Sequence, residues 1–214
     1  MSETSNGKVS SDLKNITLNK ETFTIHFNTC VDVQSITVLN NHLLELERIV
    51  LRKQNKLKRT FSQFMEDEKK SEEFEEFELD VKPKYITLNI SSYGGNIHQA
   101  LIVIDTITNL RVPVHTICTG GTASAGTMIS IHGHKRSITR NAYMLIHELS
   151  ATRTGRYSEL QLSMEHCDDL MKQIENMYIE KTKLTKEMLD EQLRKDEWWN
   201  AEKCLEVGLV EEIL

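Results

Sequence analysis

The clearest structural signal in the chain lies in ITLNISSYGGNIHQALIVIDTITNLRVPVHTIC (Ile86–Cys118). It starts with an alternating apolar run, typical of a strand, that leads into the glycine pair Gly94–Gly95. Apolar residues at helical spacing follow from Ile97 to Leu110, and a second, mostly apolar strand comes next. This order of strand, helix and strand predicts parallel strands joined by a right-handed crossover. We therefore expect an α/β fold.

A second turn of small residues, GGTASAG (Gly120–Gly126), directly follows the second strand. An apolar helix is predicted from about Ala125 to Ile131, and the next strand, AYMLIH, ends at His147. Both glycine turns come after strands and open helices, which is where ligands and reactive groups gather in α/β sheets. Ser124 lies at the start of the second helix.

Further elements are predicted on both sides of this region. A long amphipathic helix is expected from about Tyr157 to Lys181, with shorter helices over residues 186–193 and 201–207. Upstream, a strand is predicted at FTIHF, residues 23–27, after a polar segment, residues 1–18, that we expect to be flexible.

A strongly charged stretch, residues 52–80, follows a helical pattern that starts near Ile36. Its first part, RKQNKLKR (Arg52–Arg59), is basic, and its last part, Glu66–Asp80, is acidic. The acidic part could be an exposed insertion or a charged extension of the helix, and a solvated face or loop is the expected structure. We predict one folded domain over residues 19–214 that contains this charged insertion.

The composition and charge of the chain argue against several classes of function. The formal net charge of −6 over 214 residues argues against nucleic acid as the main partner, since a phosphate backbone needs a clustered basic surface. No apolar run is long enough to span a bilayer and no signal peptide is recognised, so we expect no membrane association and a cytoplasmic location. The four cysteines are far apart, which favours reduced thiols. His132 and His134 could hold a metal, but no Asp, Glu or Cys at ligand spacing supports one.

Two interpretations of Ser124 remain open from the local sequence. A serine at the start of a helix is often a simple N-cap, and the pattern Gly-x-Ser-x-Gly is not met because Thr122 occupies its first glycine position. As a nucleophile, Ser124 would need a base, and His147 ends the strand that returns to the same sheet edge. Asp196, just before the tryptophan pair Trp198–Trp199, could orient the imidazole.

Four segments, in order, resemble the proteolytic subunit of the Clp protease, ClpP. They are SSYGGNIHQALIVIDTI, VHTICTGGTASAG, YMLIHELS and KDEWWNAEKCLEVGLVEEIL, and together they lie between about Tyr85 and Leu214. The resemblance implies a ClpP/crotonase-like spiral of repeated β-β-α units with a protruding helical handle over about residues 148–182. The family's Ser-Pro-Gly-Gly turn reads Ser-Tyr-Gly-Gly here, with a tyrosine at Tyr93.

The resemblance further implies a serine peptidase with a catalytic triad. Ser124 would be the nucleophile, His147 the general base and Asp196 the acid that orients it. The backbone N–H groups of Gly95 and Ala125 would form the oxyanion hole. No metal or organic cofactor is implied.

An assembly is implied as well. In this family seven subunits form a ring, and two rings enclose a chamber that a Clp-type ATPase unfoldase feeds with unfolded chains. We therefore expect a homo-oligomer, a heptameric ring or a double-ring tetradecamer, that acts on peptides or unfolded proteins. The segment SATRTGR (Ser150–Arg156) would match the handle strand along which the peptide lies. Two alternatives are an inactive or regulatory ring subunit and a crotonase-type acyl-CoA enzyme, and the complete Ser-His-Asp set disfavours both.

Overall fold

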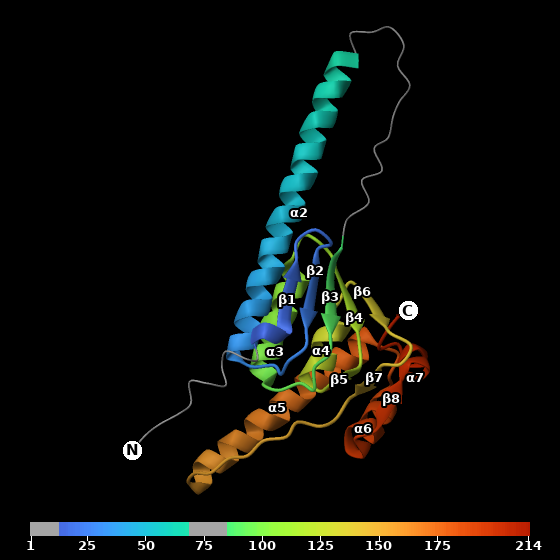
Figure 1. The fold of residues 1–214 in the computed structure, drawn as a ribbon. Helices are drawn as coiled ribbons and strands as arrows, with labels where there is room; N and C mark the ends of the chain where they lie inside the picture. The colour runs from blue at the N-terminus through green and yellow to red at the C-terminus, as the bar shows by residue number, and fades with distance from the viewer. Residues whose placement is uncertain (1–12, 69–84) are drawn as a thin grey trace.

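The computed structural model describes residues 13–68 and 85–214, and the structural statements below concern these ranges. Two sheets form the body of the molecule (Figure 1): a six-stranded sheet in the order β1-β2-β3-β4-β6-β9 and a three-stranded sheet in the order β5-β7-β8. The strands of the larger sheet are β1 (Ile16–Asn19), β2 (Thr24–Phe27), β3 (Ile86–Ile90), β4 (Val114–Cys118), β6 (Lys135–Ile138) and β9 (Glu212–Ile213).

The predicted crossover is confirmed. Strands β3 and β4 are parallel neighbours that pair Ile86 with Val114, and helix α3 (Ile97–Asn109) connects them. Only β1 and β2 pair antiparallel in this sheet, and all its other neighbouring strands are parallel. The apolar residues of β3 alternate with half-buried polar ones, so the strand turns one face into the core.

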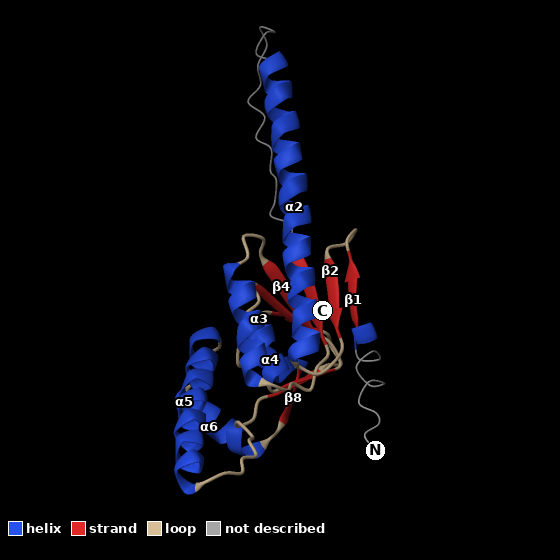
Figure 2. Ribbon diagram, turned by 90° about the vertical axis from the view of Figure 1, so that its left-hand side faces the viewer, coloured by secondary structure: helices blue, strands red, loops and turns tan. Residues whose placement is uncertain are grey.

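The helices that cover the larger sheet are α2 (Val33–Glu68) and α3, which pack side by side on one of its faces (Figure 2). Leu39, Leu43 and Leu46 of α2 are fully buried there together with Ile107 of α3. These apolar stripes, spaced at about 3.6 residues, form one continuous core with the inner face of the sheet. A short 3₁₀ helix, Leu13–Asn15, precedes β1.

The smaller sheet and the remaining helices come from the second half of the chain. Strand β7 pairs parallel with β5 and antiparallel with β8. The elements are β5 (Gly121–Ala123), α4 (Ala125–Ile131), β7 (Tyr143–Leu145), α5 (Tyr157–Lys181), α6 (Lys186–Lys195), β8 (Trp198–Asn200) and α7 (Ala201–Glu206). The helices predicted in this half lie at these places, and Gly208 after α7 has a φ of +76°, as a helix C-terminal cap requires.

Two strands followed by a helix recur along the chain as β1-β2-α2, β4-β5-α4 and β6-β7-α5. The α/β class is thereby confirmed, with repeated β-β-α units. Helix α5 protrudes from the body at the place predicted for the handle (Figure 1). Every helix within the described ranges is too short or too polar to cross a lipid bilayer.

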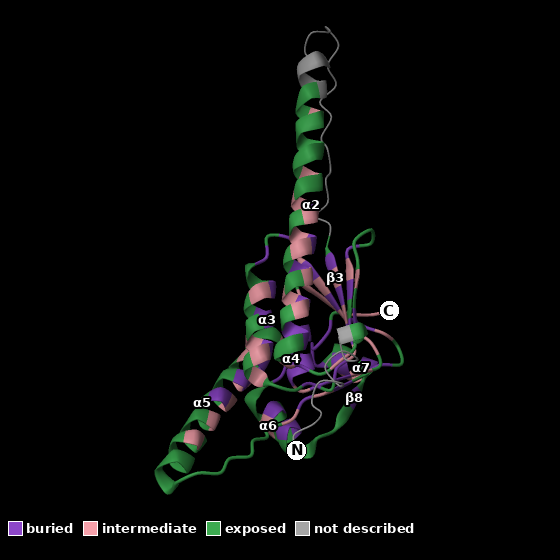
Figure 3. Ribbon diagram, turned by 60° about the vertical axis from the view of Figure 1, so that its left-hand side comes forward, coloured by how far each residue is buried: buried purple, intermediate pink, exposed green. Residues whose placement is uncertain are grey.

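Two sequence predictions, on the start of the fold and on Ser150–Arg156, need correction. The ordered fold begins before residue 19, because β1 (Ile16–Asn19) pairs with β2, whereas residues 1–12 lie outside the described ranges. The charged stretch, residues 52–80, begins as an extension of helix α2, which runs beyond the body to Glu68 (Figure 3). Its residues 52–63 are mostly exposed, and residues 69–80 lie outside the described ranges. The segment Ser150–Arg156 is not a strand, since no described strand pairs with it.

Candidate active site

Ser124 occupies a strained turn between β5 and α4. Its backbone has φ 56° and ψ −126°, a conformation that is rare for any residue with a side chain and that costs about 1–3 kcal/mol. The Ser124 side chain makes no capping hydrogen bond to helix α4, although the residue stands at the N-cap position. A capping serine would be expected to accept from the backbone N–H two or three residues later. This geometry therefore disfavours the capping interpretation of Ser124.

The turn is held in place from several sides. The backbone N–H of Ser124 donates to the Leu145 carbonyl on β7 at 3.0 Å, and the buried Thr127 hydroxyl donates to the same carbonyl at 3.1 Å. Gly94 packs directly against the serine, since a Cβ at Gly94 would lie 2.6 Å from Ser124 Cβ. Gly94 also has a φ of +91°, which favours glycine. The strain at Ser124 is thus maintained by its neighbours.

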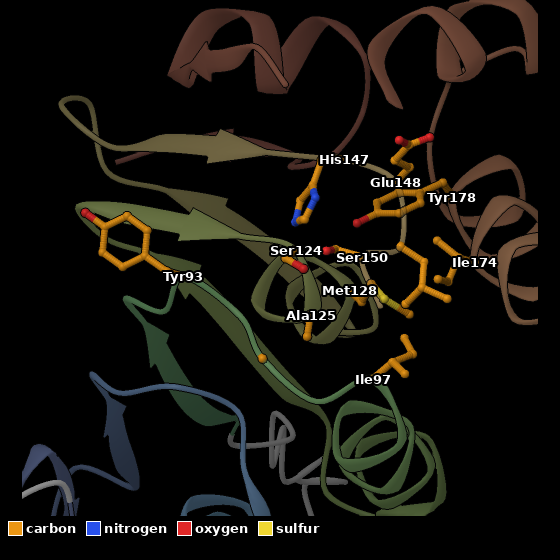
Figure 4. Close-up of a pocket in the computed structure, with 12 residues that line it drawn as sticks. Tyr93, Ile97, Ser124, Ala125, Met128, His147, Glu148, Ser150, Ile174 and Tyr178 are labelled. Atoms are coloured by element: carbon orange, nitrogen blue, oxygen red, sulfur yellow. The ribbon is translucent and has the colours of Figure 1, made fainter. Parts of the chain in front are cut away.

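His147 lies at the same sheet edge as Ser124. Strands β5 and β7 are parallel, and their last residues, Ala123 and Leu145, pair with each other. Ser124 follows β5 by one residue and His147 follows β7 by two, so both extend from the carboxyl ends of neighbouring strands. Figure 4 shows the imidazole pointing toward Ser124, and both residues line one cavity. The predicted placement of His147 next to Ser124 therefore agrees with the structure.

Asp196 approaches this edge from the antiparallel strand β8. The β7–β8 register pairs Leu145 with Trp198, and its continuation by two residues sets His147 opposite Asp196. However, Asp196 is exposed, has a left-handed backbone at the end of α6 (φ 50°, ψ 38°), and does not line the cavity. No hydrogen bond joins Ser124, His147 and Asp196 to one another among the described residues. The structure brings Ser124 and His147 together in one cavity, whereas Asp196 does not line that cavity.

Two backbone N–H groups are available beside the serine. Ala125 is the first residue of α4, where the N–H has no partner within the helix. Gly95 lies in the turn after β3, where its neighbours are bonded to Val31: the Gly94 carbonyl accepts from the Val31 N–H at 2.8 Å, and the Asn96 N–H donates to the Val31 carbonyl at 2.7 Å. Neither the Gly95 nor the Ala125 N–H donates to a described residue. Both residues line the same cavity as Ser124.

The cavity has a volume of about 260 Å³. On one side of Ser124 most of its wall is apolar and is contributed by α3, α4, α5 and the loop after β7, with the polar residues Glu148 and Ser150 beside it (Figure 4). The residues of this wall are Ile97, Met128, Leu149, Ile174 and Tyr178. Burial raises the pKa of the Tyr178 phenol well above its usual range, so this side chain stays neutral. The wall suits an apolar side chain of a bound molecule.

Gln192 of α6 connects the two loops of the site, a role that was not predicted from the sequence. Its buried side-chain amide donates to the Ile146 carbonyl at 3.3 Å and to the Glu197 carbonyl at 2.7 Å. These carbonyls immediately precede His147 and follow Asp196. A polar residue between Leu189 and Leu193 on the apolar face of α6 was the available signal.

His132 and His134 have structural contacts. The Nδ1 atom of His132 lies 2.7 Å from the Met128 carbonyl, and Nδ1 of His134 accepts from the Val114 N–H at 3.1 Å. Burial lowers the pKa of both imidazoles, which favours their neutral forms. Both rings are thus tied to backbone groups near α4 and β4, with His132 half-buried and His134 exposed.

A serine at a strained turn from a strand into a helix, with free N–H groups beside it, is an arrangement typical of serine hydrolases. The sequence model of the family described as Clp protease matches residues 40–214. The chain belongs to the Clp protease family, as the resemblance predicted. The match includes all five residues that the resemblance assigned to the site.

Proposed function

We propose that the protein is a ClpP-like serine endopeptidase that hydrolyses peptide bonds of unfolded proteins or peptides. The observation that carries this proposal is the strained Ser124, whose side chain does not cap its helix and which shares a cavity with His147 and two free N–H groups. Membership of the Clp protease family supports the same chemistry.

The geometry suggests how the reaction would proceed. Ser124 Oγ attacks the scissile carbonyl while His147 takes the hydroxyl proton. The carbonyl oxygen becomes an oxyanion that accepts from the N–H groups of Gly95 and Ala125, and one such donor is worth about 3 kcal/mol. His147 returns the proton to the leaving amine, and the C–N bond breaks to give an ester on Ser124. Water then attacks this ester, with His147 as the base, and releases the acid.

Asp196 is proposed to orient His147 once its side chain turns inward. The continued β7–β8 register already sets the backbones of these two residues opposite each other, so the carboxylate needs a local rearrangement. Catalytic hydrogen bonds are often long or misaligned without substrate. Because Gln192 joins the two loops, we expect Asp196 and His147 to move together.

We further propose that the chain assembles into a ring chamber, a heptamer or a double-ring tetradecamer, to which a Clp-type ATPase could deliver unfolded chains. The support from the structure is the outer half of α5, where Figure 3 shows mostly exposed residues and where several of these are large and apolar. These are Tyr157, Leu160, Leu162 and Met164. Such a patch marks a surface that binds protein. All four cysteines are free, in keeping with a reducing cytoplasm as the site of action.

An inactive or regulatory ring subunit is the second candidate, favoured by the exposed Asp196 carboxylate. The two functions are separated by cleavage of internally quenched peptides by the wild-type protein and by Ser124→Ala, with oligomer size measured on the same samples by analytical ultracentrifugation. Cleavage that is lost in Ser124→Ala supports the peptidase. A stable wild-type ring that cleaves no peptide overturns it in favour of the subunit without activity.

A further inference from the structure

An exposed aromatic pair lies beside the candidate active site. The rings of Tyr93 and Trp198 meet edge to face, with centroids 5.9 Å apart and planes at 77°. Tyr93 precedes the turn that carries Gly95, and Trp198 opens β8 two residues after Asp196. The pair thus joins the loop of the proposed oxyanion hole to the loop of the proposed orienting acid.

Both rings are open to solvent. Tyr93 is 76% exposed and Trp198 is 38% exposed, although aromatic rings of this size are usually buried to a large extent. Gly121 of β5 lies beneath them: a Cβ at Gly121 would stand 3.4 Å from the Tyr93 hydroxyl oxygen and 3.6 Å from Trp198 Cη2. The two rings therefore rest on the backbone of β5 and present their free surfaces outward. We call Tyr93, Trp198 and Gly121 the aromatic shelf.

The shelf and the apolar wall lie on opposite sides of the nucleophile. Tyr93 lines the same cavity as Ser124, and Figure 4 shows it on the far side of Ser124 from Ile97, Met128 and Ile174. A peptide whose scissile carbonyl sits at Ser124 has one flanking residue on each side of the attacked bond. One side chain would reach the apolar wall, and the other would reach the shelf.

We propose that the aromatic shelf is a specificity subsite that binds an aromatic or large apolar side chain flanking the scissile bond, on the side opposite the residue held by the apolar wall. Edge-to-face and offset stacking give aromatic pairs a geometric preference that small side chains cannot match. The proposal rests on the proposed peptidase function of the same site. It assigns to Tyr93 and Trp198 a role in substrate choice, separate from the bond-breaking step.

Cleavage-site profiling of a peptide library tests the proposal, with wild type, Tyr93→Ala and the matched control Tyr93→Phe. We expect wild type and Tyr93→Phe to prefer an aromatic residue at one flank of the cleaved bond. In Tyr93→Ala that preference should fall about tenfold, whereas the preference at the other flank stays, since one pocket contact changes selectivity on this scale. A Tyr93→Ala profile identical to wild type, or changed equally at both flanks, overturns the proposal.

A binding measurement separates the shelf from catalysis. Of the two tryptophans, Trp199 is only 9% exposed, so ligand effects on fluorescence report mainly on Trp198. In the Ser124→Ala variant, a peptide with an aromatic flank should change the fluorescence at lower concentration than its alanine counterpart, and Tyr93→Ala should remove the difference. If the wild-type protein fails to react with a fluorophosphonate, the proposed peptidase function is overturned. The fluorescence titration does not depend on catalysis, so it still tests whether the aromatic shelf binds the flanking side chain. Equal titration curves for the two peptides would overturn the proposed subsite and leave the proposed peptidase function unaffected.

Discussion

Gly94→Ala should abolish most peptidase activity while the protein stays folded. The new Cβ would lie 2.6 Å from Ser124 Cβ, 2.8 Å from the Ala123 carbonyl oxygen and 2.9 Å from the Ala125 nitrogen. Restoring an ordinary contact of about 3.5 Å requires the turn and the nucleophile to separate by about 1 Å. A misplacement of this size costs about 100-fold in rate. The positive φ of +91° adds about 1–2 kcal/mol of instability, which a typical domain tolerates.

The assay compares kcat/KM on a fluorogenic peptide with the midpoint of thermal unfolding, and Gly120→Ala is the matched control. Gly120 has a φ of +61°, so its alanine variant bears a similar backbone strain. Its added Cβ would meet only the Ser91 hydroxyl at 3.4 Å, and it would not touch Ser124. We expect both variants to lose some stability and only Gly94→Ala to lose activity. If Gly94→Ala and Gly120→Ala have equal kcat/KM, the contact between Gly94 and Ser124 does not position the nucleophile.

Asp196, His132 and the buried cysteines each allow a separate test. Asp196→Asn should lower kcat, by as much as about 10⁴-fold if Asp196 orients His147, without changing the sedimentation of the protein in ultracentrifugation. A wild-type kcat in this variant would show that Asp196 does not take part in catalysis. Burial lowers the pKa of His132 in the folded protein, so the unfolded chain takes up more protons as the pH falls below about 6.5, and stability is lost in that direction. Urea unfolding between pH 7 and pH 5 should show this loss of stability, and His132→Gln should reduce it. If the free energy of unfolding depends on pH equally in the variant and in wild type, His132 is not the source of the loss. Burial raises the pKa of Cys118 to about 11 and of Cys204 to about 12, so maleimide should modify the exposed Cys30 in the native protein and these two only after unfolding, as followed by mass spectrometry.

The sequence predicts the helices of this protein better than its strands. Helices α4 and α5 lie where the apolar spacing indicates, because a helix is stabilised by contacts three and four residues apart. Strands β6 and β8 were not predicted: KRSI is half charged, and WWN is only three residues long. Their pairing depends on partners far away in the chain, which short local patterns do not reveal.

In the candidate site, too, the features that depend on distant residues were not predictable from the local sequence. Local sequence left Ser124 open between a cap and a nucleophile, since both need a small polar residue at the start of a helix. The φ of Ser124 and its missing capping bond are tertiary features, imposed by Gly94 and by the pairing with β7. Exposure of the Asp196 carboxylate depends on the end of α6, and no sequence pattern indicated it.

Ser124 is expected to be an activated nucleophile, and the most direct test is to locate the residue that reacts with a fluorophosphonate, by mass spectrometry of the digested protein. We predict one phosphonylated peptide, modified at Ser124, and no labelling of Ser124→Ala at the same probe concentration and time. An unmodified Ser124 in a folded and assembled wild-type protein, or equal labelling of Ser124→Ala, would contradict the claim.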